Sequence, residues 1–112
     1  MQNKSSIAEL NALEPIKSRT RLIVGDVSVA STSAHASAPY WTLDVVGDSI
    51  LMSFDPVAHD TVGSQVLHQF IDAKKGYKPA TNMAKQWLKN AANLGLGTND
   101  PVQIDLVEVN LG

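Results

Sequence analysis

Apolar and polar residues alternate along two neighbouring segments, residues 41–46 and 49–54. This alternation is typical of strands that bury one face. Gly47 and Asp48 separate the segments, and a Gly at the first position of a two-residue turn favours a hairpin. In that register the apolar side chains share one buried face, in the opposed pairs Trp41–Phe54, Leu43–Met52 and Val45–Ile50. The alternative is two strands that are adjacent in sequence but not paired with each other.

A helix is predicted directly after these strands, over residues 56–75. Asp55 suits the N-cap and Pro56 the first helical position. Apolar residues then recur at helical spacing up to residue 71. Gly63 is an interior weak point, and it indicates either a close contact between helix and sheet or a later start of the helix at Ser64. Gly76 suits the position just after the last helical residue.

Two further helices are predicted from their ends. Ser6 and Glu9 fit a capping box at the start of a short N-terminal helix, which Pro15 would end. Thr81 is a candidate N-cap for a second long helix, and Gly95 would close it.

Two further strands complete the predicted fold. Residues 21–30 contain a continuous apolar run, which favours a central strand of a sheet. Residues 102–109 alternate as in a last strand, with a change of phase at Val107. We therefore expect a single domain of the α+β or mixed α/β class, with about four strands including a hairpin, in the order α-β-β-β-α-α-β.

Composition narrows the function classes. The chain has 112 residues, a net charge of −2 and no cysteine. The charge does not favour nucleic acid as a partner, and disulfides and thiolate metal sites are excluded. No apolar run is long enough for a membrane span, and the first ten residues lack the apolar core of a signal peptide. The compartment stays unknown.

Four residues form the candidate site: Asp26, Asp55, Asp60 and His59. Asp26 and Asp55 each follow an apolar strand, and parallel strands would bring both to the edge of the sheet where ligands bind. Clustered carboxylates favour a hard cation, so Mg²⁺ or Ca²⁺ is the expected ligand. The competing interpretation is structural, with Asp55 as a helix cap, Asp26 as a turn residue and His59 as a packed side chain.

The segment from Ser49 onward resembles the C-terminal part of the family called domain of unknown function 362. The resemblance is carried by Ser53–Asp60 (SFDPVAHD), the Val62–Gly63 step, the stretch Ala91–Gly97 and the final segment Ile104–Val109, with Leu22–Asp26 similar to an earlier strand of that family. Some members carry ferredoxin-type cysteine clusters, but this chain has no cysteine, so no iron–sulfur cluster is expected. The longer N-terminal part of the family's domain is missing, and the family implies no settled activity.

Three hypotheses about function remain open. The first is a domain that binds a ligand or divalent cation as part of a larger protein, with the missing N-terminal portion as its partner. The second is a non-catalytic interaction module that forms homo-oligomers, or pairs through a sheet edge. Double-stranded RNA binding is a distant third, because the order α-β-β-β-α is shared but the lysines lie at the wrong end of the helix.

Overall fold

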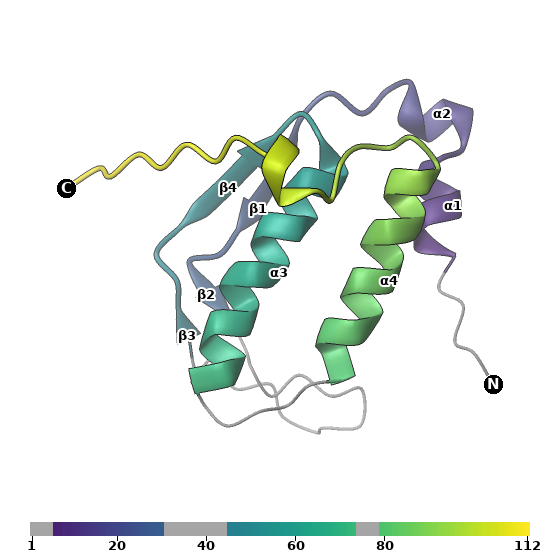
Figure 1. The fold of residues 1–112 in the computed structure, drawn as a ribbon. Coiled ribbons are helices and arrows are strands. Elements are labelled where there is room, and N and C mark those ends of the chain that lie inside the picture. Colours follow the sequence, from purple (N-terminus) through teal and green to yellow (C-terminus); the bar gives the residue numbers. More distant parts are fainter. Residues whose placement is uncertain (1–5, 31–44, 74–78) are drawn as a thin grey trace.

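The computed structural model describes residues 6–30, 45–73 and 79–112 (Figure 1). Within these ranges the fold is mixed α+β, as predicted, with four α-helices and antiparallel pairs of short strands. In chain order the elements are α1 (Ile7–Asn11), α2 (Glu14–Lys17), β1 (Ile23–Asp26), β2 (Val29–Ala30), β3 (Val45–Val46), β4 (Ile50–Ser53), α3 (Pro56–Ala73), α4 (Pro79–Asn93) and the 3₁₀ turn η1 (Pro101–Gln103). The predicted order of elements is therefore wrong at both ends of the chain.

The strands form one long two-stranded ribbon rather than the predicted hairpin. β1 pairs antiparallel with β4, and β2 pairs antiparallel with β3. In this register Val24 lies opposite Met52, and Asp26 lies opposite Ile50. The predicted pairs Leu43–Met52 and Val45–Ile50 are therefore wrong. β3 and β4 are adjacent in sequence but do not pair with each other, which is the alternative left open above. Residues 41–44 lie outside the described residues.

A β-bulge stands where the sequence predicted a hairpin turn. The backbone N–H groups of Gly47 and Asp48 both donate to the carbonyl of Ser28, at 3.0 and 3.3 Å. Two residues of one strand therefore oppose one residue of the other, which bends the ribbon between its two halves. Asp48 takes the positive φ, at 46°, while Gly47 is needed because a Cβ there would press on the carbonyl of Val27.

The two faces of the ribbon differ in exposure. Along β1 and β4 the partly buried residues alternate with exposed ones, and the partly buried set includes Gly25 and Leu51, which lie close to side chains or backbone of α3. Val24 and Met52 point the other way. The expectation that Phe54 is buried is wrong, since this residue is 84% exposed. The expectation of a central first strand is wrong as well, because β1 has a single partner strand among the described residues.

α3 begins at Pro56, as predicted, and packs on the inner face of the ribbon. Gly63 makes the close contact with the sheet that the sequence indicated, because a Cβ on it would lie 3.5 Å from Leu51 Cδ1. The alternative start at Ser64 is wrong. The predicted end of this helix, at Lys75 and Gly76, lies outside the described residues.

α4 packs beside α3, and α1 packs against α4 (Figure 1). α4 starts at Pro79, two residues before the predicted N-cap Thr81, and its last residue is Asn93. Gly95 follows with a positive φ of 74° and closes the helix, as predicted. There the N–H of Leu96 donates to the carbonyl of Ala91 and that of Gly95 to Ala92, which is the Schellman arrangement. No helix in the described part of the chain is long and apolar enough to cross a membrane.

The N-terminal helices and the C-terminal segment also depart from prediction. α1 starts near Ser6, but the Ser6 side chain makes no capping hydrogen bond, so the capping box is wrong. Pro15 lies in the first turn of α2. Residues 104–112 form no strand, which corrects the predicted last strand at 102–109.

The fully buried core within the described residues is small. It consists of Ala8, Val57 and Ala58, together with Thr61, whose hydroxyl donates to the Val57 carbonyl at 2.7 Å. Ala8 lies on α1, and the other three residues lie in the first two turns of α3. A core of this size stabilises the chain only modestly.

Candidate functional site

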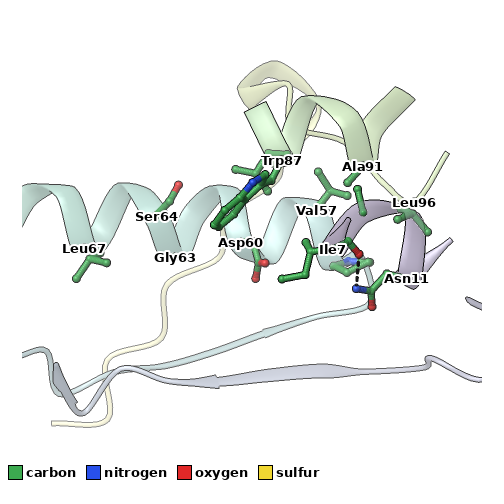
Figure 2. A pocket seen from close by; sticks show the side chains of 13 residues that line it. Ile7, Asn11, Val57, Asp60, Gly63, Ser64, Leu67, Trp87, Ala91 and Leu96 are labelled. Atoms are coloured by element: carbon green, nitrogen blue, oxygen red, sulfur yellow. Dashed lines mark hydrogen bonds between the residues drawn. The ribbon is translucent and has the colours of Figure 1, made fainter. Parts of the chain in front are cut away.

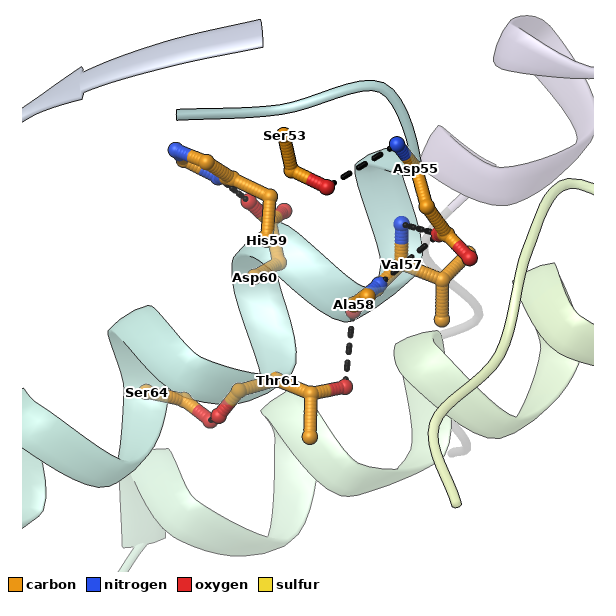
Figure 3. A network of polar contacts seen from close by, with 8 residues as sticks. All are labelled: Ser53, Asp55, Val57, Ala58, His59, Asp60, Thr61 and Ser64. Carbon is orange, nitrogen blue, oxygen red and sulfur yellow. Dashed lines mark hydrogen bonds and ion pairs between the residues drawn. The ribbon is translucent and has the colours of Figure 1, made fainter. Parts of the chain in front are cut away.

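Asp55 is fully engaged as a structural carboxylate (Figure 3). Its Oδ1 accepts hydrogen bonds from the backbone N–H groups of Val57 and Ala58, both at 2.8 Å, which caps α3. Its Oδ2 accepts from the N–H of Thr98 at 2.9 Å. Asp55 thus joins the start of α3 to the loop after α4. Gly97 is required at this contact, because a Cβ there would collide with the Asp55 carboxylate.

His59 and Asp60 form a pair on α3 (Figure 3). The His59 Nδ1 lies 2.9 Å from the Asp60 Oδ1. The imidazole side chain is only 10% exposed, while that of Asp60 is 70% exposed. The ring fits beneath the sheet because Gly25 has no side chain, and a Cβ at that position would lie 2.7 Å from His59 Nε2. No described residue gives Nε2 a hydrogen-bond partner.

Asp26 lies apart from the other three site candidates. Because β1 and β4 are antiparallel, Asp26 is opposite the first residue of β4, whereas Asp55 follows the last. The assumption of parallel strands was therefore wrong. Asp26 is exposed, and its Oδ1 accepts from the N–H of Ser28 at 2.9 Å. Hydrogen bonds from the Ser28 side chain, and then from its backbone, hold the pKa of Asp26 below its ordinary value.

The predicted Mg²⁺ or Ca²⁺ site gains no support from this arrangement. Among the described residues no group of three or more His, Asp or Glu side chains is placed to hold a metal ion. Asp55 already uses both oxygens for backbone N–H groups. The structural interpretation of Asp55 as a cap therefore accounts for its geometry.

A hollow of about 380 Å³ lies between α1, α3 and α4 (Figure 2). Its wall is mostly apolar, and the Trp87 ring reaches from α4 toward α3. Three polar side chains, Asn11, Asp60 and Ser64, also line it. Asn11 and Ser64 are bound to backbone carbonyls of their own helices. The one charged group among the described residues at this hollow is the Asp60 carboxylate, whose Oδ1 also pairs with His59 Nδ1.

The second candidate site is the apolar side of the ribbon that faces away from α3. We call it the outer face and define it by five residues that are all more than half exposed: Leu22, Val24, Ile50, Met52 and Phe54. Charged residues lie at its two ends, the exposed Arg21 before Leu22 and Asp26 beside Ile50. Exposed apolar patches of this kind mark interaction surfaces.

Sequence reasoning found part of this geometry and missed the rest. It placed Asp55, Asp60 and His59 near one helix start, where the structure has them on adjacent turns, but it wrongly placed Asp26 with them. It missed the outer face, because alternation alone does not tell which of two apolar sets is covered. It also missed the contact between Asp55 and Thr98, which joins residues 43 positions apart and leaves no local signal.

Comparison with protein-family models, with curated proteins and with solved structures finds no match to this chain. The resemblance to domain of unknown function 362 therefore stays a prediction from the motifs named above.

Proposed function

We propose that this chain is a non-catalytic interaction module that associates with a second copy of itself through the outer face. The observation that carries the proposal is the exposure of Met52 and Phe54, at 68% and 84%, on a ribbon whose opposite side packs on α3. The five side chains leave an apolar patch on the order of 500 Å², which is the size of the largest patch on a typical monomer, and patches of that size are often functional.

The occupant is a second copy because the outer face is complementary to itself. A two-fold axis brings the same patch of both copies together, and it sets the Leu22 end of one outer face against the Ile50 end of the other. The apolar centre between these ends carries no charge. A stable dimer buries about 800 Å² on each partner, so this dimer would have to cover about 300 Å² of the polar rim in addition to the outer face.

Sedimentation equilibrium tests this proposal at micromolar concentration. The wild type should form a dimer, and Met52→Lys should be monomeric, because a lysine at the centre of the interface would be buried without a partner. Gln65→Lys is the matched control, since it adds the same charge at an exposed position of α3. A wild type that stays monomeric at all concentrations, or a Met52→Lys dimer as strong as the control, would contradict the proposal.

A second candidate function is binding of a small ligand in the hollow between α1, α3 and α4. Its volume lies in the range of ligand pockets, and an apolar wall with one carboxylate suits an apolar body that carries a cationic group. Trp87 adds an aromatic ring, which attracts a cation. This is the form in which we retain the hypothesis of a ligand-binding domain.

Phenethylamine is a suitable probe, with phenylpropionate and benzyl alcohol as its anionic and neutral counterparts. We expect phenethylamine alone to raise the melting temperature at millimolar concentration, and Asp60→Asn to remove the rise. If all three compounds raise the melting temperature equally, the Asp60 carboxylate does not select a cationic ligand.

A further inference from the structure

Residues 104–112, here called the C-terminal arm, extend outward from η1 beyond the rest of the fold (Figure 1). No hydrogen bond between two backbone groups joins residues 105–112 to any other described residue, and the Gly112 N–H donates to the Asn110 side chain within the arm. The arm's apolar side chains are free as well, with Val109 76% and Leu111 96% exposed. The arm therefore presents unpaired backbone groups and apolar side chains together, and such groups are satisfied when a strand pairs with another.

The arm has the pattern of a strand without having a partner. Val107, Val109 and Leu111 alternate with Glu108 and Asn110, so one side of an extended arm is apolar and the other polar. The ribbon offers an unpaired strand edge for such a segment. Among the described strands β1 pairs only with β4, so its other edge is free. An extended segment that adds to such an edge is a common mode of recognition.

We propose that the arm of one copy adds as a parallel strand to the free edge of β1 in a second copy. This inference rests on the proposed self-association and names the segment that makes the contact. Opposite charges favour this edge. The arm carries the acidic residues Asp105 and Glu108, whereas the segment before β1 carries three exposed basic residues, Lys17, Arg19 and Arg21.

The register follows from two independent features that agree. With Asp105 beside Arg21, the arm's apolar residues fall beside the inward positions of the first strand, in the pairs Val107–Ile23, Val109–Gly25 and Leu111–Val27. These positions are on the side of α3, so the apolar side chains leave water when the arm docks. Glu108 then lies beside Val24, on the outer side of the ribbon.

Cross-linking between two singly substituted chains tests the register, because the natural chain has no cysteine. A Val24→Cys chain and a Glu108→Cys chain are mixed under mild oxidation. We expect a disulfide-linked heterodimer, since neighbouring positions of paired strands bring the two Cβ atoms within reach of a disulfide. Met52→Cys is the matched control: it is on the same face but on β4, one strand further from the arm, and should not cross-link with Glu108→Cys. Equal yields for both mixtures, or none for either, would overturn the proposed docking.

A truncated chain that ends at Gln103 separates this inference from the proposed function. We expect it to stay folded, since the arm's one backbone hydrogen bond to the fold, from the N–H of Ile104 to the carbonyl of Pro101, only closes η1, and its dimer dissociation constant should rise at least about tenfold. An unchanged dissociation constant would refute the proposed docking of the arm, while the outer face would remain the proposed interface. A wild type that is monomeric would refute the proposed function itself. Charge reversal gives the second measurement: Arg21→Glu should weaken the dimer, and Asp105→Arg in the same chain should restore it.

Discussion

Asp55 shows how a single side chain can account for a motif without any ligand. It accepts two backbone hydrogen bonds at the start of α3 and a third from Thr98. An N-cap contributes about 1 kcal/mol, and a hydrogen bond to a charged group about 1.5–3 kcal/mol. We therefore expect Asp55→Ala to lower the free energy of unfolding by roughly 2–4 kcal/mol in a urea titration.

Asp100→Ala is the control for this measurement. Asp100 also caps a helical turn, by accepting from the N–H of Val102, but it is exposed and the turn is short. Its loss should cost no more than about 1 kcal/mol. If both substitutions cost the same, Asp55 does not join α3 to the loop after α4 in solution.

Asp26 gives a prediction at the same scale about pH. Hydrogen bonds from Ser28 lower the pKa of the folded state, so this carboxylate adds stability above its ordinary pKa, and that contribution is lost as pH falls through the lower, folded value. A carboxyl NMR titration should give a midpoint below 3.8. Ser28→Ala removes the first of the two causes and should raise the midpoint. A midpoint that does not respond to Ser28→Ala would show that the hydrogen bond is absent.

Gly25 and His59 should behave as a coupled pair. A Cβ on residue 25 would lie 2.7 Å from the His59 ring, so Gly25→Ala should cost about 1–3 kcal/mol through overpacking. In a His59→Ala background the same change should cost much less, because the obstructing ring is gone. Thermal or urea unfolding of the wild type, the two single variants and the double variant gives the coupling energy. If the two effects are additive, the His59 ring does not lie against residue 25 in solution.

At the scale of elements, local signals predicted the long helices and failed on the sheet. Asp55–Pro56 fixed the start of α3, and Gly95 the end of α4, because a cap depends on residues within one turn. Strand pairing depends on residues far apart in the chain, here residues 23–26 with 50–53. Gly47–Asp48 provides the positive φ that a turn needs, but a bulge needs it too, and only the distant partner Ser28 decides between them.

The same limit applied to the candidate site. His59 and Asp60 are neighbours in sequence, so their proximity was certain and their burial was the open question. Asp26 could be placed only by knowing the direction of β1 relative to β4. Strand direction decides which carboxylates meet, and no residue type encodes it.

At the scale of the whole molecule, the small core and the uncovered outer face have one thermodynamic consequence. If the folded state is a dimer, the melting temperature must rise with protein concentration, because association stabilises the folded chain by mass action. We expect this dependence for the wild type and for Gln65→Lys in thermal unfolding between about 1 and 100 μM, where a micromolar dissociation constant shifts the equilibrium. Met52→Lys should melt at one temperature throughout this range, close to that of the dilute wild type, since Met52 is exposed in the single chain and its replacement leaves the core of the monomer unchanged. A concentration dependence that survives in Met52→Lys would show that the chain associates through another surface.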